Sequence, residues 1–361
     1  MKIVHLVGNR PQFIKLAILE NAFKKYPQVK QVIVHTGQHF DTNMSDIFFD
    51  ELAIPAPSYH LQINKMTHGA MLGHMLIEIE IILLKEKPDW VVVFGDTNTT
   101  LAGAIAAKKL HIKLAHIESG VRTFNEEMPE ESNRYLSDRL ADINFCCTAD
   151  NAEQLKKEGY GSDSIRSAII NSGDIMLDAT IFYKDKISKR PILDELGIKN
   201  EKFVLATIHR AENTENITYL KHIISALNKI NTDTKVILLI HPNTKNILLK
   251  ENITASFTIV DALGYLDTQA LLNAATYVIT DSGGLSREAF FYNKPTVIIM
   301  QRPFWPEIIA NGNCLLAQPS IEDILHQFST IKQQIKQAKT SLFGTGNAAA
   351  IIAEAIVKFS N

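Results

Sequence analysis

The sequence has few cysteines and little net charge, and both absences exclude classes of protein. Its three cysteines are Cys146, Cys147 and Cys314, an odd number without the spacing of a metal site. Two of them lie in the apolar run INFCCT, so we predict buried, reduced thiols. The net charge of -2 offers no basic surface and therefore argues against nucleic acid as a partner.

The sequence also lacks the features of membrane and secreted proteins. No apolar run reaches the length that spans a bilayer. The first residues, MKIVHLVG, have the pattern of a short strand and lack the long apolar core and small-residue cleavage site of a signal peptide. We therefore expect a cytoplasmic protein that does not bind a membrane.

Several common catalytic motifs are missing as well. GNRPQ has a single glycine, so it is not the dinucleotide fingerprint G-x-G-x-x-G, and GDTNTT is not a Walker loop. Neither G-x-S-x-G nor H-E-x-x-H occurs in the sequence. DSGG matches the nucleophile string of serine proteases only by chance, because the fold predicted below places it differently.

Short apolar runs alternate with helix-like segments along the whole chain. KIVHLVG, QVIVHTG, DWVVVFGD, KLAHIESG and INFCCT are a first set of predicted strands, and FVLATIH, KVILLIH, FTIVDAL, YVITDSGG and PTVIIM are a second. Continuous apolar strands with intervening helices indicate parallel sheets that are covered on both faces. We predict an α/β protein with two doubly wound, Rossmann-like domains that face a cleft.

The length of 361 residues also favours two domains, because a single ordinary core does not grow to this size. We place the first domain at residues 1–170 and the second at residues 171–343. The last segment, residues 344–361, contains GNAAAIIAEAIVKF, which has the pattern of a helix. We expect this helix to pack back on the first domain.

Polar residues gather directly after the predicted strands, where parallel α/β sheets bind ligands. They lie in GNRPQFIK, TGQHF, GDTNTT, ESGVRT, IHRAEN, IHPNTK and DSGGLSRE. Structural roles are open for most of them: Asp96 could cap a helix, and His209 could form a structural pair with the next arginine. Glu118 is harder to explain in this way, because an unpaired buried carboxylate is costly. We expect Arg122 or Arg134 to pair with it.

The stretch TDSGGLSREA, residues 280–289, follows an apolar run and precedes a predicted helix. Asp281 or Ser282 can cap that helix, which is a structural explanation. The alternative is an anion site, because the two glycines let a phosphate approach backbone N–H groups at the positive end of the helix. Glu288 would then face the same site and accept hydrogen bonds from sugar hydroxyls.

The motifs VGNRPQFIK, HTGQHF, FGDTNTTLAGA, HIESGVRT, MPEESNR, HRAEN, HPN and TDSGGLSREA occur in this order over nearly the whole chain. Together they resemble the non-hydrolysing UDP-N-acetylglucosamine 2-epimerase family, which has a glycosyltransferase-B-like fold. RPQFIK, TGQHFD.NMS and FN..MPEE are especially similar to its UDP-2,3-diacetamido-2,3-dideoxyglucuronate 2-epimerase branch.

The resemblance implies inversion at C2 of a UDP-sugar without a metal or redox cofactor. The C2 proton is removed while UDP leaves C1, and UDP adds back with a proton delivered to the other face of C2. The expected substrate is UDP-N-acetylglucosamine, and the alternative is the diacetamido glucuronate. The resemblance further implies a homodimer that serves surface polysaccharide precursor synthesis.

The resemblance also assigns roles to individual side chains. The acid–base and positioning set is Asp96, Glu118, Glu130 and His209, within which the assignments stay open because close carboxylates titrate together. The substrate-binding set is Arg10, Lys15 and Arg134 beside substrate charge, His241 and Asn243 in the cleft, Ser282, Gly283 and Gly284 at the pyrophosphate, and Glu288 at the ribose hydroxyls. The second domain would thus bind UDP.

The sequence departs from the family at several positions. Ser119 stands where alanine is usual, Arg287 where the residue is typically uncharged or acidic, and Trp305 where many relatives carry arginine. Thr268 lies near the place of an aromatic residue expected to stack on uracil. NKMTHGAM lacks the Arg-Gln pair of a second, activating site. The substrate therefore stays open, and we do not expect allosteric activation.

Three other functions share parts of this pattern. A glycosyltransferase has the same fold but needs an acceptor substrate. A hydrolysing epimerase releases UDP, and the motif RPQFIK disfavours it. A silent UDP-sugar-binding protein would not need the complete acid–base set.

Overall fold

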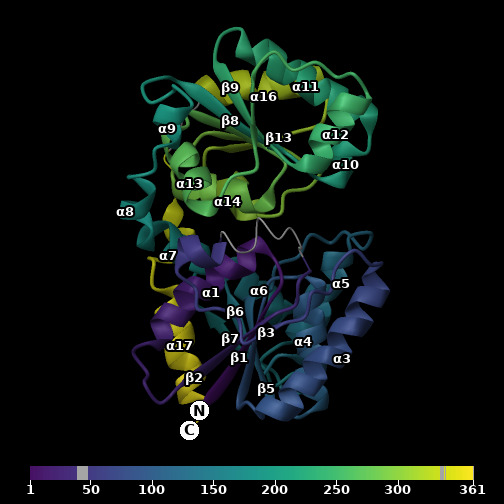
Figure 1. Cartoon of the computed structure of the whole chain (residues 1–361), viewed down its shortest axis with the longest axis vertical. Helices are drawn as coiled ribbons and strands as arrows, with labels where there is room; N and C mark the ends of the chain where they lie inside the picture. Colours follow the sequence, from purple (N-terminus) through teal and green to yellow (C-terminus); the bar gives the residue numbers. More distant parts are fainter. Residues whose placement is uncertain (39–47, 334–336, 338, 361) are drawn as a thin grey trace. The chain divides into compact units, whose positions relative to one another are not determined.

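The computed structural model describes residues 1–38, 48–333, 337 and 339–360, and the chain divides into two units (Figure 1). The first unit contains Met1–Phe182 and Ser341–Asn361. The second contains Tyr183–Thr340. The chain therefore leaves the first unit later than the predicted boundary at residue 170 and returns to it slightly before residue 344.

The first unit is built around a parallel sheet with the strand order β3-β2-β1-β4-β5-β6-β7. Its central strands are apolar and buried throughout, as a sheet that is covered on both faces requires. The strands are β1 (Lys2–Val7), β2 (Lys30–His35), β3 (Tyr59–His60), β4 (Trp90–Phe94), β5 (Lys113–Ser119), β6 (Ile143–Cys146) and β7 (Ala168–Asn171).

Two groups of helices cover the first sheet. The helices α1 (Arg10–Phe23), α7 (Ile175–Phe182) and α17 (Ala348–Lys358) pack against one another. In the other group, α4 (Asn98–Lys109) contacts both α3 (His68–Glu86) and α5 (Pro129–Leu140) (Figure 1). The helix α6 (Ala149–Lys157) packs beside β6 and β7.

The segment Thr340–Lys358 is apolar and long enough to cross a membrane by length and composition. In the structure it is interrupted, because Gly344 and Gly346 have φ angles of 92° and 84° between a 3₁₀ turn and α17. The 11 residues of α17 span about 16 Å, roughly half of the ~30 Å hydrocarbon core. Ile352 and Ile356 are buried, so α17 is a packed helix of the first unit.

The second unit has a parallel sheet with the order β10-β9-β8-β11-β12-β13. Its strands are β8 (Phe203–Ile208), β9 (Lys235–Ile240), β10 (Thr258–Asp261), β11 (Tyr277–Thr280), β12 (Thr296–Ile299) and β13 (Cys314–Ala317). Its helices are α8 (Lys184–Ile187), α9 (Ile192–Glu195), α10 (Ala211–Thr214), α11 (Ile217–Asn231), α12 (Pro242–Lys250), α13 (Tyr265–Ala274), α14 (Gly283–Phe291), α15 (Pro306–Asn311) and α16 (Ile321–Gln333). The predicted α/β class with two Rossmann-like domains is confirmed.

Each sheet has a point at which its strand order reverses, between β1 and β4 in the first unit and between β8 and β11 in the second. Ligands of doubly wound sheets bind outside the carboxyl ends of the strands at such a point. GNRPQFIK and GDTNTT follow the first pair of strands, and IHRAEN and DSGGLSRE follow the second. The fold therefore brings predicted site motifs to both reversal points.

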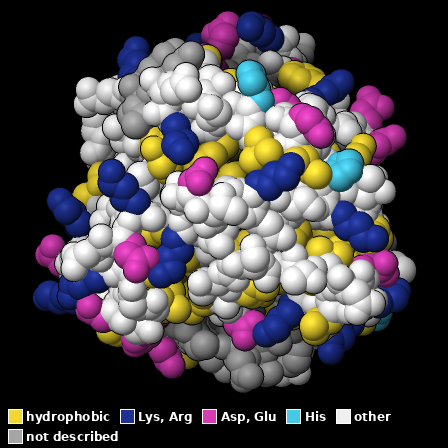
Figure 2. Space-filling view, turned by 90° about the horizontal axis from the view of Figure 1, so that it is seen from above, with side chains coloured by type: hydrophobic (Ala, Val, Ile, Leu, Met, Phe, Trp, Pro, Cys, Tyr) yellow, Lys and Arg dark blue, Asp and Glu magenta, His cyan; other side chains and the backbone are white. Residues whose placement is uncertain are grey.

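The burial of the three cysteines is confirmed, and all three are free thiols. Burial raises the pKa of Cys146, so this thiol stays protonated. On the face drawn in Figure 2, lysine and arginine side chains are interspersed with aspartate and glutamate. That face therefore presents no extended basic surface to a polyanion.

The docking of α17 depends on one buried carboxylate, and this generates a prediction. Asp178 on α7 accepts a hydrogen bond of 2.8 Å from the Ala349 backbone N–H. Asp178→Ala should lower the free energy of unfolding by about 1–3 kcal/mol, because a buried donor loses its acceptor. Urea unfolding measures this loss, and exposed Glu354→Ala on α17 is the control. Equal stability of the two variants would contradict the assignment.

Candidate active site

Lys15 and Glu118 form a buried ion pair at the carboxyl edge of the first sheet. Lys15 Nζ lies 2.5 Å from Glu118 Oε2, and the two side chains are 3% and 10% exposed. A Cβ placed on Gly95, which follows β4, would lie 3.9 Å from both Glu118 Oε1 and Lys15 Nζ. Groups that follow β1 and β4 thus meet a group at the end of β5. The partner seen here is Lys15, whereas an arginine was expected. Arg122 forms ion pairs with Asp138 and Glu158, and Arg134 forms them with Asp96 and Glu131.

Glu118 has an unusual backbone conformation. Its φ angle is 74°, in the left-handed region, and the β5–β6 register shifts between Ile117 and Ser119. A residue other than glycine pays about 1–3 kcal/mol for such a conformation, so the surroundings must hold it. A β-bulge of this kind re-aims the side chain that it contains. The distortion therefore places Glu118 beside Lys15.

Asp96, directly after β4, is held by α5. Arg134 donates to Asp96 Oδ2 from Nε at 3.0 Å and from Nη2 at 2.6 Å. The Nδ2 of Asn133 donates to the Asp96 carbonyl oxygen at 2.9 Å. The structural alternative for Asp96 was a helix cap, but Thr97 caps α4 instead. Asp96 remains 22% exposed and can therefore meet a ligand.

The two neighbouring glutamates of MPEES differ in environment. Glu131 is buried and accepts hydrogen bonds from Thr123, from the Phe124 N–H and from Arg134. Burial alone would raise the pKa of Glu131, but the hydrogen bonds and the arginine hold it below its usual range. Glu130, in the first turn of α5, is only partly buried. Glu131 is thus structural, and Glu130 stays the candidate for chemistry.

The remaining predicted cation of the first unit, Arg10, begins α1 and lies over the ring of Phe48, 4.9 Å from its centroid. The motif HTGQHF is described only as far as Gln38, and His39 and Phe40 lie outside the described residues. Gln38 accepts from the Thr99 N–H at 3.1 Å, which ties the end of this motif to α4.

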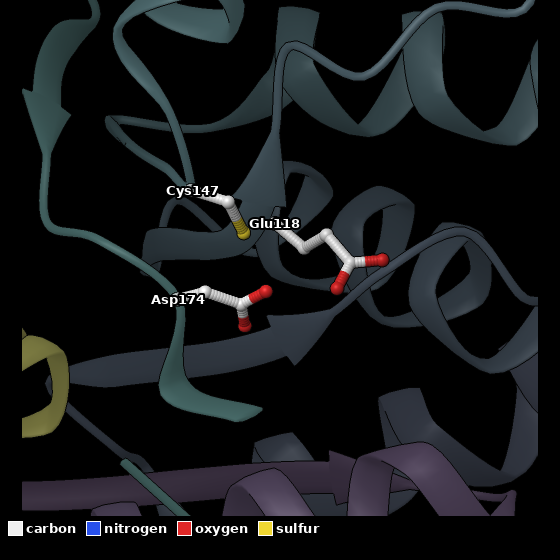
Figure 3. A group of neighbouring side chains, drawn as sticks. All are labelled: Glu118, Cys147 and Asp174. Carbon is white, nitrogen blue, oxygen red and sulfur yellow. The ribbon is translucent and has the colours of Figure 1, made fainter. Parts of the chain in front are cut away.

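Among the described residues, one group of side chains has the composition of a metal site. Oxygens of Glu118 and Asp174 and the sulfur of Cys147 lie within 4.8 Å of one another (Figure 3). Lys15 already provides a positive charge 2.5 Å from Glu118, where a divalent cation would be repelled. Asp174 also accepts from the Met176 N–H at 2.8 Å and so helps to begin α7. We therefore assign no metal to this group.

Asp281 organises the site of the second unit. Its fully buried carboxylate accepts from the backbone N–H of His209 and Arg210 and from the side chain of Asn213. His209 Nδ1 lies 3.3 Å from Asp281 Oδ1. A proton on Nδ1 would make Nε2 the basic nitrogen of His209, whose side chain is 45% exposed. From the sequence, Asp281 was predicted only as a candidate helix cap.

The segment that follows β11 has the helix-capping role that was predicted as its structural explanation. Ser282 caps α14, since its Oγ accepts from the Leu285 N–H at 3.2 Å. Phe304 packs against Gly283, where an added Cβ would lie 3.0 Å from the ring. A Cβ on Gly284 would meet Ser282 Oγ at 3.8 Å, an ordinary contact. The close packing of Phe304 therefore explains the glycine at position 283. Glu288, further along α14, is buried.

Three predicted residues of the second unit line one pocket. Its volume is about 470 Å³, and His209, His241 and Asn243 contribute to its wall. His241 caps α12, with its Nδ1 3.3 Å from the Asn243 nitrogen. The pocket lies after β8 and β9, beside the strand end that carries Ser282.

Several departures from the family pattern have a structural explanation. Arg287 stacks on Trp305, with its guanidinium carbon 4.4 Å from the ring centroid, and both residues are buried. The two departures are therefore one packed pair. Ser119 Oγ donates to the His116 carbonyl oxygen at 2.9 Å, within the bulge. Thr268 is buried and bonds the Gly264 carbonyl, so it does not replace an aromatic.

Comparison with known proteins identifies the relatives of this chain. A family model described as UDP-N-acetylglucosamine 2-epimerase matches residues 21–357. The UDP-2,3-diacetamido-2,3-dideoxy-D-glucuronate 2-epimerase of Pseudomonas aeruginosa is 42% identical over 360 residues, 99% of this chain and 100% of the relative. A UDP-N-acetylglucosamine 2-epimerase homolog of Methanococcus maripaludis is 42% identical over 364 residues, 99% of each chain.

Solved structures agree with these relatives. The Methanocaldococcus jannaschii UDP-GlcNAc 2-epimerase in complex with UDP-GlcNAc and UDP superimposes with a TM-score of 0.92. The two sequences are 35% identical, and the match covers 99% of this chain and 100% of that one.

The contrast between the adjacent glutamates generates a prediction for stability. Glu131→Gln should lower the free energy of unfolding at pH 7 by about 3–5 kcal/mol, because buried Arg134 loses a charged partner. Glu130→Gln is the matched control and should change it by less than about 0.5 kcal/mol. Urea unfolding of both variants measures the difference, and similar losses would refute the assignment.

The lowered pKa of Glu131 also fixes a pH dependence. A carboxylate whose folded pKa is depressed contributes stability above its unfolded pKa and loses it as pH falls through the folded value. The stability difference between wild type and Glu131→Gln should therefore be complete at neutral pH and shrink below about pH 4. A difference that stays constant down to pH 3 would contradict this.

Proposed function

Because the chain belongs to the UDP-N-acetylglucosamine 2-epimerase family, we propose that it is an isomerase that interconverts UDP-N-acetylglucosamine and UDP-N-acetylmannosamine. The observation that carries this proposal is the meeting of Lys15, Glu118 and the Gly95–Asp96 segment at the carboxyl edge of the first sheet. Epimerisation at C2 needs acid–base groups beside the sugar, and this edge supplies carboxylates with a fixed lysine.

The proposed reaction removes the C2 proton and expels UDP. The electrons of the C2–H bond form the C1=C2 double bond, and those of the C1–O bond leave with UDP. UDP then adds back to C1 while a proton arrives at the other face of C2. Asp96, Glu118, Glu130 and His209 form the proposed acid–base and positioning set. Glu118 is best restrained for this role, because Lys15 fixes its carboxylate.

The second unit would bind the nucleotide. The start of α14 directs backbone N–H groups and the positive end of the helix dipole toward a diphosphate. Glu288 would accept hydrogen bonds from the ribose hydroxyls, and His241 and Asn243 would line the path of the sugar nucleotide. Arg10, Lys15 and Arg134 of the first unit are the proposed cations beside substrate charge.

The alternative substrate is UDP-2,3-diacetamido-2,3-dideoxyglucuronate. The identity of 42% to a Pseudomonas aeruginosa enzyme named for this sugar favours it. The Methanococcus maripaludis homolog of the N-acetylglucosamine enzyme is equally similar, and we therefore keep UDP-N-acetylglucosamine first. Either sugar would serve as a precursor of surface polysaccharide.

We also propose a cytoplasmic homodimer. Ile77, Ile81 and Leu84 on α3 are 58%, 55% and 56% exposed, and their spacing places them on one helix face. An apolar stripe of this kind is typical of an interface between identical subunits. The buried, free thiols fit a reducing compartment.

Incubation with UDP-N-acetylglucosamine in D₂O tests the reaction by NMR. We expect the 2-epimer to form and C2 to gain deuterium, because the proton that returns comes from solvent. Epimerisation with the original C2 hydrogen retained would refute elimination and re-addition. Release of free N-acetylmannosamine would indicate a hydrolysing enzyme, and a requirement for an acceptor would indicate a transferase. A kcat/KM ~100-fold higher for the diacetamido glucuronate, about 2.7 kcal/mol, would reverse the substrate choice.

Two substitutions separate nucleotide binding from chemistry. Glu288→Ala should weaken UDP binding by roughly 1.5–3 kcal/mol for each lost hydrogen bond to the charged acceptor. Asp96→Asn should leave UDP affinity nearly unchanged and lower turnover, because the shape is kept while the carboxylate is lost. Calorimetry with UDP and the epimerisation assay measure both. Normal UDP binding by the first variant, or full turnover by the second, would remove that residue from its proposed role.

A further inference from the structure

A buried charge network lies behind the bulge that carries Glu118. Asp138 on α5 is fully buried, and its Oδ1 is 2.7 Å from His116 Nδ1. Its Oδ2 accepts from the Gly120 N–H at 3.2 Å and from Arg122 Nη1 at 2.7 Å. Arg122 also forms a two-point ion pair with Glu158, with distances of 2.9 and 2.7 Å. One carboxylate therefore holds the chain on both sides of Glu118.

His116 extends this hold to the neighbouring strand. Its Nε2 lies 2.6 Å from the Gly95 carbonyl oxygen, which can only accept a hydrogen bond. The ring thus bonds Gly95, the residue before Asp96, on one side and Asp138 on the other. Burial alone would raise the pKa of Asp138, but the hydrogen bonds and charges of His116 and Arg122 hold it below its usual range. The Asp138 carboxylate and the Gly95 carbonyl oxygen thus lie at opposite nitrogens of the His116 ring.

The network places Arg122 between two carboxylates. Arg122 bonds both Asp138 and Glu158, and His116 bonds Asp138 from the other side. A buried ion network without one of its partners is strongly unfavourable, so each member restricts the positions of the others. Asp138 has no exposed surface and cannot touch a substrate. Any effect of Asp138 on the reaction must therefore pass through the residues that it holds.

We infer that Asp138 is a positioning residue for the epimerase reaction, which fixes Glu118 in its left-handed conformation through the flanking His116 and Gly120. Through His116 it also fixes Gly95 and hence the start of the segment with Asp96. This inference rests on the proposed function, because that function gives Glu118 and Asp96 their roles. The orientation of Glu118, which is proposed to lie beside the sugar, then depends on Asp138, which does not contact the sugar.

Asp138→Asn tests the inference in the full-length protein. The amide has no negative charge, and its NH₂ group must face one of two sides. On one side is His116 Nδ1, which can accept only without its proton; on the other are Gly120 and Arg122, which would lose their acceptor. The hold on that side is therefore altered or lost. We expect kcat to fall by about 100-fold, the effect of a small misplacement of a reacting group, while KM and the UDP dissociation constant stay within about twofold. Exchange of the Gly120 amide hydrogen with D₂O should become faster. Unchanged kcat in a folded Asp138→Asn protein would overturn the inference.

Asp142→Asn is the matched control. Asp142 accepts from the Leu114 N–H at 2.8 Å, so it holds the same strand β5 at the end away from Glu118. We expect this variant to keep the wild-type kcat, KM and Gly120 exchange. An equal fall of kcat in both variants would indicate a general loosening of β5 and would overturn the positioning role.

A second variant covers the case in which Asp138→Asn does not fold. His116→Phe keeps a ring of similar shape but removes both hydrogen bonds, and it should lower kcat with little change in KM. Wild-type kcat in this variant would also overturn the inference. Gly120 exchange is measured without substrate, so it tests the hold on the bulge even if the wild-type protein epimerises no UDP-sugar. A wild-type protein that epimerises no UDP-sugar would refute the proposed function but not the hold of Asp138 on the bulge.

Discussion

The ion pair between Lys15 and Glu118 is the interaction on which the site of the first unit depends. It joins the helix after β1 to the end of β5, and Gly95 after β4 lies against both side chains. Both charges are nearly buried, so the loss of either partner would be costly to the other. A buried pair of this kind limits where each side chain can lie. The left-handed conformation of Glu118 is tolerated because this end of the strand is held from several directions.

The fold could be predicted because its strands are continuous apolar runs, and a central parallel strand such as β4 needs no other signal. The motifs at the strand ends could be predicted for the same reason, because topology alone brings residues such as Lys15 and Asp96 to one edge. Their partners could not be predicted in this way. Which cation meets Glu118 depends on side-chain positions, and the sequence offered two nearby arginines instead of the lysine that lies far from it along the chain.

The helix α5 explains why much of the network was missed. Its sequence, PEESNRYLSDRL, is mostly polar and resembles a solvated helix, yet Glu131, Arg134 and Asp138 are buried. They recur at spacings of three and four residues, so they form one face. That face is buried by hydrogen bonding to strand ends and not by the hydrophobic effect. A stripe of alternating charge on a predicted helix is the signal that could have revealed it.

In both units, a buried aspartate accepts hydrogen bonds from backbone N–H groups at the end of a strand. In the first, Asp138 binds the backbone N–H of Gly120 beside Glu118, and in the second, Asp281 binds the backbone N–H groups of His209 and Arg210. Each buried carboxylate accepts from backbone N–H groups at a strand end, which would otherwise lack acceptors. An apolar side chain of similar size could fill the space but could not accept these hydrogen bonds. The buried acids are therefore needed because Glu118 and His209 stand at strand ends, where the sheet itself provides no acceptors.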